Sequence, residues 1–162
     1  KKTLLTSQQN CDPELWFVGP DDENIMPDLM SSGSEISNSI KYFGATYHPE
    51  HYMMAADVIC LPSYREGFGS IIIEAAACCL PSIGYKINGL VDSVDNGSTG
   101  LLVQYQDIDI LAEAMTDLLK DKKNRLLLGE NAYKHAVEKF SQDKITNLYR
   151  KSVLQALDLN DT

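Results

Sequence analysis

The chain has 162 residues and a formal net charge of −9, with 44% hydrophobic and 23% charged residues. This length allows one domain with a buried core, and the composition is ordinary for a globular protein. The acidic charge argues against nucleic acid as a partner, because phosphate backbones attract clustered Lys and Arg. It also argues against this part of the chain docking on an anionic membrane.

The sequence shows no apolar run long enough to span a bilayer and no signal-peptide pattern. It starts at Lys1 rather than Met, so we expect a piece of a longer protein. The four cysteines lack the paired spacing of a zinc site. They are interpreted as small buried residues in a reducing compartment, and the expected location is the cytoplasm.

Short apolar runs alternate with stretches of helical periodicity along the chain. Strands are predicted at residues 15–18, 40–43, 57–61, 82–85 and 100–103, and helices at 21–36, 49–56, 69–79, 108–119, 122–139 and 142–157. Pro27 fits only the first turn of its helix, and Ser141 is the predicted N-cap of the last one. The alternation predicts a doubly wound α/β domain, with a parallel sheet covered by helices on both faces.

Ligands of such sheets bind outside the carboxyl ends of the strands, near helix N-termini. This rule selects the loops that follow Val18, Phe43, Leu61, Tyr85 and Val103. A phosphate site can be built there from backbone N–H groups even in an acidic domain, because such a site needs little net charge.

The loop after Leu61 is the most informative, because it carries two glycines where the strand gives way to a helix. Gly67 and Gly69 let a ligand approach the backbone closely, and the helix N-terminus that follows can hold a diphosphate. Glu74 is a lone carboxylate in an otherwise apolar helix. Its carboxylate either reaches the rim of the helix surface and binds a polar group, or is paired with a polar group inside the protein. Glu66, taken alone, has the pattern of a solvated loop residue.

Other polar residues have an ordinary structural interpretation. His48 and His51 lack a Cys or Asp at ligand spacing and are expected at the surface without a metal. His135 is expected on the solvated face of a helix, and Trp16 in the core rather than stacked on a sugar. Arg65, next to the loop glutamate, fits a ligand-binding and a solvated role equally well.

Several segments resemble one known family, in the right order along the chain. They are WFVG (16–19), ADVICLPS (56–63), EGFG (66–69), EAAA (74–77), LPSI (80–83), NGSTGLLV (96–103) and FS (140–141). Together they resemble the family 4 retaining glycosyltransferases with the GT-B fold, in particular bacterial polysaccharide and O-antigen enzymes. The resemblance implies that residues 1–162 are the Rossmann-like C-terminal half, with its first strand truncated and the acceptor-binding N-terminal domain absent.

The resemblance also implies a role for each residue of the motif. Glu66 is the catalytic carboxylate at the donor sugar, and Glu74 binds the two ribose hydroxyls. The sugar and diphosphate are bound by Arg65, Gly67, Phe68, Gly69, Ser70 and Ile71, and the nucleotide lies near Gly19, Phe43 and Gly44. No metal or other cofactor is implied, because fixed donors and cationic side chains stabilise the leaving diphosphate.

The implied function is transfer, with retention, of a sugar from a nucleotide diphosphate sugar, expected to be UDP-linked. The acceptor is a glycan or lipid-linked oligosaccharide in cell-surface polysaccharide synthesis, with the whole enzyme at the inner face of the plasma membrane. Two alternatives remain: a GT-B nucleotide-sugar epimerase, which needs its own carboxylate pair and a His, and a non-catalytic α/β binding module, which needs an acidic cluster after its first strand.

The sequence departs from the family in two respects. Cys79 stands where the family usually has Gly, and no loss is expected because Cys is small. The family's cationic residues that neutralise the diphosphate fall at or before Lys1, and the acceptor-binding domain is missing. The chain by itself is therefore expected to be inactive.

Overall fold

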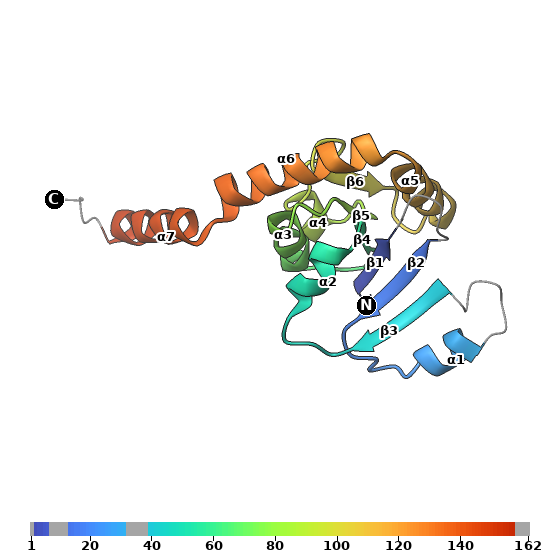
Figure 1. Ribbon diagram of the computed structural model, residues 1–162. Coiled ribbons are helices and arrows are strands. Elements are labelled where there is room, and N and C mark those ends of the chain that lie inside the picture. The colour runs from blue at the N-terminus through green and yellow to red at the C-terminus, as the bar shows by residue number, and fades with distance from the viewer. Residues whose placement is uncertain (1, 7–12, 32–38, 158–162) are drawn as a thin grey trace.

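The computed structural model describes residues 2–6, 13–31 and 39–157. Six strands form one sheet in the order β3-β2-β1-β4-β5-β6, flanked by helices (Figure 1). This is the strand order of the Rossmann fold, so the predicted α/β architecture is confirmed. The strands are β1 (Lys2–Thr6), β2 (Glu14–Val18), β3 (Ile40–Gly44), β4 (Val58–Leu61), β5 (Ser82–Tyr85) and β6 (Gly100–Val103).

Seven helices are found in the described part of the chain, and none is long and apolar enough to cross a membrane. They are α1 (Met26–Ser31), α2 (Pro49–Ala55), α3 (Ser70–Ala77), α4 (Asn88–Val91), α5 (Ile108–Lys120), α6 (Lys122–Phe140) and α7 (Gln142–Ala156). All five predicted strands are present. The short helix α4 was not predicted, because four residues are too few to show a helical period.

The helix predicted at 21–36 is wrong in its extent. Within the described residues it begins only at Met26, and residues 32–38 lie outside the described part. The Asp21 carboxylate accepts hydrogen bonds from the N–H groups of Ile25 and Met26, at 3.2 and 2.8 Å. These bonds satisfy donors at the late helix start, and Pro27 stands in the first turn as predicted.

Strand β1 departs from the predicted all-parallel sheet. It runs antiparallel to both of its neighbours, with Leu4 opposite Trp16 on β2 and opposite Ile59 on β4. A parallel connection needs a crossover of a dozen or more residues, and the segment 7–13 between β1 and β2 is shorter than that. The other strands all share one direction, because β2 and β4 are both antiparallel to β1.

The core lies on both faces of the sheet, as the alternation of β4 requires. Ile59 and Leu61 pack toward α2, α3 and α4, whereas Val58 and Cys60 pack toward α5 and α6. All four side chains are buried. Burial on both faces explains why β4 appears in the sequence as a continuous apolar run rather than as an alternating one.

Helix α6 is fixed to the domain by a buried guanidinium. Arg125 is 6% exposed; it donates to the carbonyl oxygens of Leu118 and Leu119 at 2.8 and 2.6 Å, and to the Asp57 carboxylate at 3.1 Å. It thus joins the α5–α6 turn to the start of β4. Helix α7, in contrast, has no buried residue and extends away from the sheet (Figure 1). Ser141 stands at its N-cap, but its side chain makes no capping hydrogen bond, which corrects that part of the prediction.

Candidate functional site

The carboxyl ends of the parallel strands lie at one edge of the sheet, where the strand-end rule predicts ligands. At the ends of β2 and β3, the Gly19 N–H donates to the Gly44 carbonyl at 2.7 Å. Both glycines have positive φ, 130° and 68°, and a Cβ at either position would meet no atom within 4 Å. The backbone conformation therefore selects glycine here, and open space surrounds both positions.

The loop between β4 and α3 holds the first of the two predicted glutamates. The Ser63 hydroxyl donates to Glu66 Oε1 at 2.7 Å, and both residues are partly buried. On the other side, a Cβ at Gly89 in α4 would come within 2.4 Å of the Glu66 carbonyl oxygen. Glu66 is therefore held in place at both its carboxylate and its backbone, and it is not the freely solvated loop residue that it resembles in isolation.

The two glycines beside Glu66 differ in what surrounds them. Gly69 is the N-cap of α3 in the left-handed region, and a Cβ there would approach the side chain of Leu90 to 2.7 Å. Gly67 is exposed, and a Cβ there would meet nothing within 4 Å. Protein packing thus requires Gly69 but not Gly67, so the space beside Gly67, two residues before the α3 N-cap, is open.

Glu74 lies on α3, one turn beyond Ser70, and is exposed. The apolar surroundings inferred from composition are therefore wrong on its side of the helix, because Ile71, Ile72, Ala75 and Ala76 take the buried faces. Among the described residues, no hydrogen bond or ion pair involves the Glu74 carboxylate. The alternative of pairing inside the protein is thus wrong, because the Glu74 carboxylate lies at the surface, and its binding of a polar group stays a prediction.

Two open cavities flank the loop of Glu66. The first, of about 690 Å³, lies between the ends of β2 and β4 and is lined by Gly19, Glu23 and Ser63 among others. The second, of about 560 Å³, is lined by Tyr64, Arg65, Glu66, Lys86, Ile87, Asn88 and Tyr105. Arg65 is exposed and lines both cavities, and Lys86 adds a second cation beside Glu66.

Two aromatic residues of the predicted site have packing roles for their side chains. Phe68 contacts Phe140 at the end of α6, with ring centroids 5.3 Å apart. Phe43 packs between Trp16 and Tyr52, at 5.2 and 4.9 Å, so this cluster covers the sheet on the side of α2. Trp16 is part of that packing, as predicted.

The prediction of surface positions is correct for two of the three histidines and wrong for the third. His48 and His51 are exposed, as predicted. His135 is not on a solvated face: it is partly buried beside Phe140, and its buried Nε2 atom has no hydrogen-bond partner among the residues that the structure describes. Burial, and secondarily Lys139, lower the pKa of His135, whereas Asp95 and Glu138 act in the opposite direction. A helical period cannot show this, because the burial depends on segments distant in the chain, such as that of Asp95.

Sequence reasoning missed several residues of this edge. Ser63, Lys86, Asn88, Gly89 and Tyr105 lie around Glu66, but they come from three loops and from helix α4. Ser63 carried a signal, since a hydroxyl three residues before a loop glutamate is within reach of its carboxylate. The others carried none that could be distinguished from ordinary loop composition.

Residues 3–135 match the family model of the glycosyl transferases group 1. The N,N'-diacetylbacillosaminyl-diphospho-undecaprenol alpha-1,3-N-acetylgalactosaminyltransferase of Campylobacter jejuni is 32% identical over 92% of the chain and 38% of that relative. The D-inositol 3-phosphate glycosyltransferase of Corynebacterium jeikeium is 42% identical over 70% of the chain and 27% of that relative. The chain therefore spans well under half the length of these relatives.

Solved structures have the same fold. Sucrose-phosphate synthase from Thermosynechococcus elongatus superposes with a TM-score of 0.74 at 29% identity, over 86% of the chain and 38% of that structure. HepE from Anabaena, in complex with UDP and glucose, superposes with a TM-score of 0.80 at 22% identity, over 90% of the chain and 42% of that structure. The likeness covers one Rossmann-like half of each neighbour.

Proposed function

Since the chain belongs to the group 1 glycosyl transferases, we propose that it binds the nucleotide diphosphate sugar and contributes the donor half of the active site. The family assignment favours neither an epimerase nor a non-catalytic module. The single observation that carries the proposal is the loop 62–69, which places an anchored carboxylate, Glu66, beside an open cavity and shortly before the N-terminus of α3, at the carboxyl edge of the sheet.

The diphosphate is proposed to lie against the first N–H groups of α3, at Ser70 and Ile71. The exposed position and free surroundings of Gly67 support this, because a side chain there would occupy the approach to those groups. Arg65 and Lys86 line the adjoining space and supply positive charge to the leaving diphosphate. They offer cationic groups in place of those expected at or before Lys1.

The two glutamates are proposed to bind different parts of the donor. Glu66, held by Ser63, faces the reacting sugar, and transfer proceeds with retention without a metal. Glu74, exposed and unpaired within the described residues, binds the two ribose hydroxyls with its two oxygens. The nucleotide base then lies toward the loops of Gly19 and Gly44, whose surroundings are open.

The acceptor of the whole protein is proposed to be a glycan or a lipid-linked oligosaccharide in cell-surface polysaccharide synthesis, used at the cytoplasmic face of the membrane. Two similar proteins support this choice. The Campylobacter jejuni relative is named for an undecaprenol-linked acceptor, and a relative 38% identical over 55% of the chain is the capsular polysaccharide biosynthesis glycosyltransferase CapM of Staphylococcus aureus.

Binding of UDP and of a UDP-sugar, followed by NMR without added magnesium, tests the proposal. We expect shifted resonances at residues 67–74 and around Gly19 and Gly44. A dinucleotide such as NAD serves as the control, because Rossmann-like domains that are not glycosyl transferases bind dinucleotides at this edge of the sheet. Tighter binding of NAD than of UDP would remove the main support for the proposal.

Substitution of the two glutamates tests their separate roles. Glu74→Gln keeps the shape but removes the charge that strengthens hydrogen bonds to ribose. Because a charge-assisted bond contributes about 1.5–3 kcal/mol, this change should weaken UDP about tenfold or more. Glu66→Gln should leave UDP affinity nearly unchanged, since UDP lacks the sugar. In the full-length enzyme it should lower kcat far more than it raises KM.

The two variants control for each other, provided that both keep the thermal midpoint of the unsubstituted chain. Loss of UDP binding in Glu66→Gln together with unchanged binding in Glu74→Gln would show that the two carboxylates are assigned the wrong way round.

A further inference from the structure

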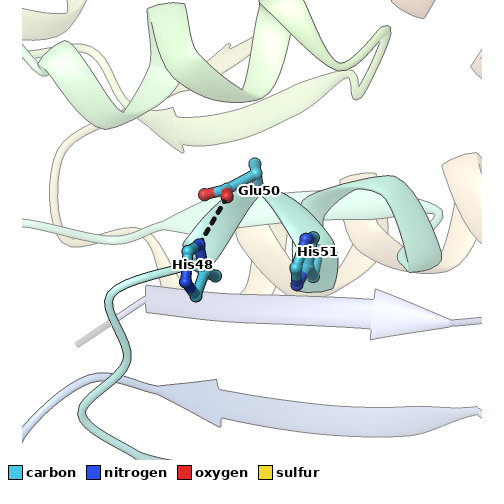
Figure 2. A group of neighbouring side chains, drawn as sticks. All are labelled: His48, Glu50 and His51. Atoms are coloured by element: carbon cyan, nitrogen blue, oxygen red, sulfur yellow. Dashed lines mark hydrogen bonds and ion pairs between the residues drawn. The ribbon is translucent and has the colours of Figure 1, made fainter.

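Three potential metal ligands lie together at the start of α2, outside the loop 62–69 (Figure 2). They are His48, Glu50 and His51, and all three are exposed. The segment follows the end of β3, so it stands at the same edge of the sheet as Gly44. The spacing alone predicted only surface histidines, because it does not show where the three side chains point.

The potential ligand atoms of the three side chains lie near one another. One ligand atom of each residue lies within 4.8 Å of those of the other two. His48 Nδ1 and Glu50 Oε1 are 3.1 Å apart, and the rings of His48 and His51 are stacked at 5.2 Å with 17° between their planes. Ligand atoms around one transition ion are separated by little more than 3 Å, given bonds of about 2.0–2.2 Å. Small side-chain rotations therefore bring the set into coordination distance.

The backbone of the segment restricts the arrangement of the ligands. Pro49 stands between His48 and Glu50 at the first turn of α2, and its ring fixes φ at that position. His48 is the N-cap residue but makes no side-chain capping bond, so its imidazole is not committed to the helix. Less conformational freedom then remains to be lost when a metal binds.

The donor set selects the kind of ion. Two imidazoles and one carboxylate suit Zn²⁺ and Ni²⁺, whereas Mg²⁺ prefers oxygen ligands alone. The positive end of the helix dipole disfavours a cation at the N-terminus of α2. The negative charge of the Glu50 carboxylate and the net charge of −9 on the whole chain act in the opposite direction. Among the described residues, no Lys or Arg forms an ion pair with Glu50.

From this geometry we infer that His48, Glu50 and His51 form a binding site for a divalent transition-metal ion such as Zn²⁺, with the remaining coordination positions open to water. The site is independent of the nucleotide-sugar proposal, because it shares none of the residues proposed to bind the donor.

Calorimetric titration of the metal-free chain with Zn²⁺ tests this inference. We expect one site that Mg²⁺ in excess does not displace. His51→Gln and Glu50→Gln should each weaken Zn²⁺ by more than tenfold, since loss of an outer-shell partner alone costs about 10–100-fold. Because all three side chains are exposed, these changes should leave the thermal midpoint of the metal-free chain unaltered.

Matched controls separate this site from the other metal-binding side chains. His135→Gln removes the third histidine, and Cys78→Ser with Cys79→Ser removes the two thiols that are not buried among the described residues. Neither change should alter Zn²⁺ affinity. With paramagnetic Ni²⁺ as the probe, NMR signals should broaden first at residues 46–54.

Three outcomes overturn the inference. The first is Zn²⁺ binding that survives His51→Gln and disappears in the cysteine variant. The second is broadening by Ni²⁺ centred elsewhere in the chain, and the third is titration with no single saturable site.

Discussion

Packing and backbone conformation restrict three positions around α3 to different degrees. Gly69 is required both by its positive φ and by the side chain of Leu90, whereas Gly67 is required by neither. Cys79 has a φ of 57° directly after the helix. There the Leu80 N–H donates to the Ala75 carbonyl and the Cys79 N–H to the Ala76 carbonyl, both at 3.0 Å. This pair of bonds is the Schellman motif, whose left-handed residue is usually Gly.

The expectation that Cys79 replaces Gly without loss of stability therefore rested on the wrong property. It was based on side-chain size, but the restriction is in the backbone, because a Cβ disfavours the left-handed region by about 1–2 kcal/mol. Part of that cost is offset, since Gly has more conformational freedom to lose from the unfolded chain.

We predict that Cys79→Gly raises the free energy of unfolding by about 1 kcal/mol, because relief of the left-handed strain exceeds the added entropy cost of Gly. Chemical denaturation under reducing conditions measures the change. Cys79→Ala is the matched control: it also removes the thiol but retains the Cβ, so it should show no gain. Equal stabilisation by both variants would attribute the effect to loss of the thiol instead.

Among the elements, α6 packs along α3, the helix that follows the loop 62–69. Its Gly129 packs so closely on the end of α3 that a Cβ would lie 2.1 Å from the Cys79 carbonyl oxygen. Ala76 of α3 meets Ala132 and Ala136 of α6 in a cluster of small residues. At the start of α6, Arg125 ties the same helix to Asp57 at the start of β4.

We predict that Arg125→Ala lowers the free energy of unfolding by about 3 kcal/mol. Removal of one partner from a buried ion pair costs about 3–5 kcal/mol, and the partial exposure of Asp57 favours the lower end. Arg125→Lys keeps the charge but not the forked geometry that reaches two carbonyls and a carboxylate, so it should lose less. Denaturant titrations of both variants measure the order; a larger loss in the Lys variant would contradict it.

At the scale of the whole molecule, the chain is proposed to contribute one half of a catalytic cleft. The chain spans between 27% and 38% of the length of the two relatives compared with it, and its cavities beside Glu66 are open. Transfer needs donor and acceptor held together and shielded from water, which a single Rossmann-like half does not provide.

We therefore predict that this chain alone binds UDP-sugar but transfers no sugar to a lipid-linked or glycan acceptor. Release of UDP and formation of product, followed with the donors that bind, measure this. The full-length protein in the same assay is the control for the choice of donor and acceptor. Robust transfer by the chain alone would show that the acceptor-binding region lies within these residues.

The sequence by itself determined the fold class, the positions of the strands β2 to β6 and the family, and it is the basis on which Glu66 and Glu74 are proposed as site residues. It could do so because these features depend on local patterns: apolar runs, glycines at strand ends, and ordered segments shared with a family. The antiparallel direction of β1, the exposure of Glu74, the bond from Ser63 to Glu66 and the burial of His135 were decided only by the tertiary structure. The convergence of His48, Glu50 and His51 belongs with them. Each depends on side-chain direction or on neighbours distant in the chain, and residue spacing along one segment records neither.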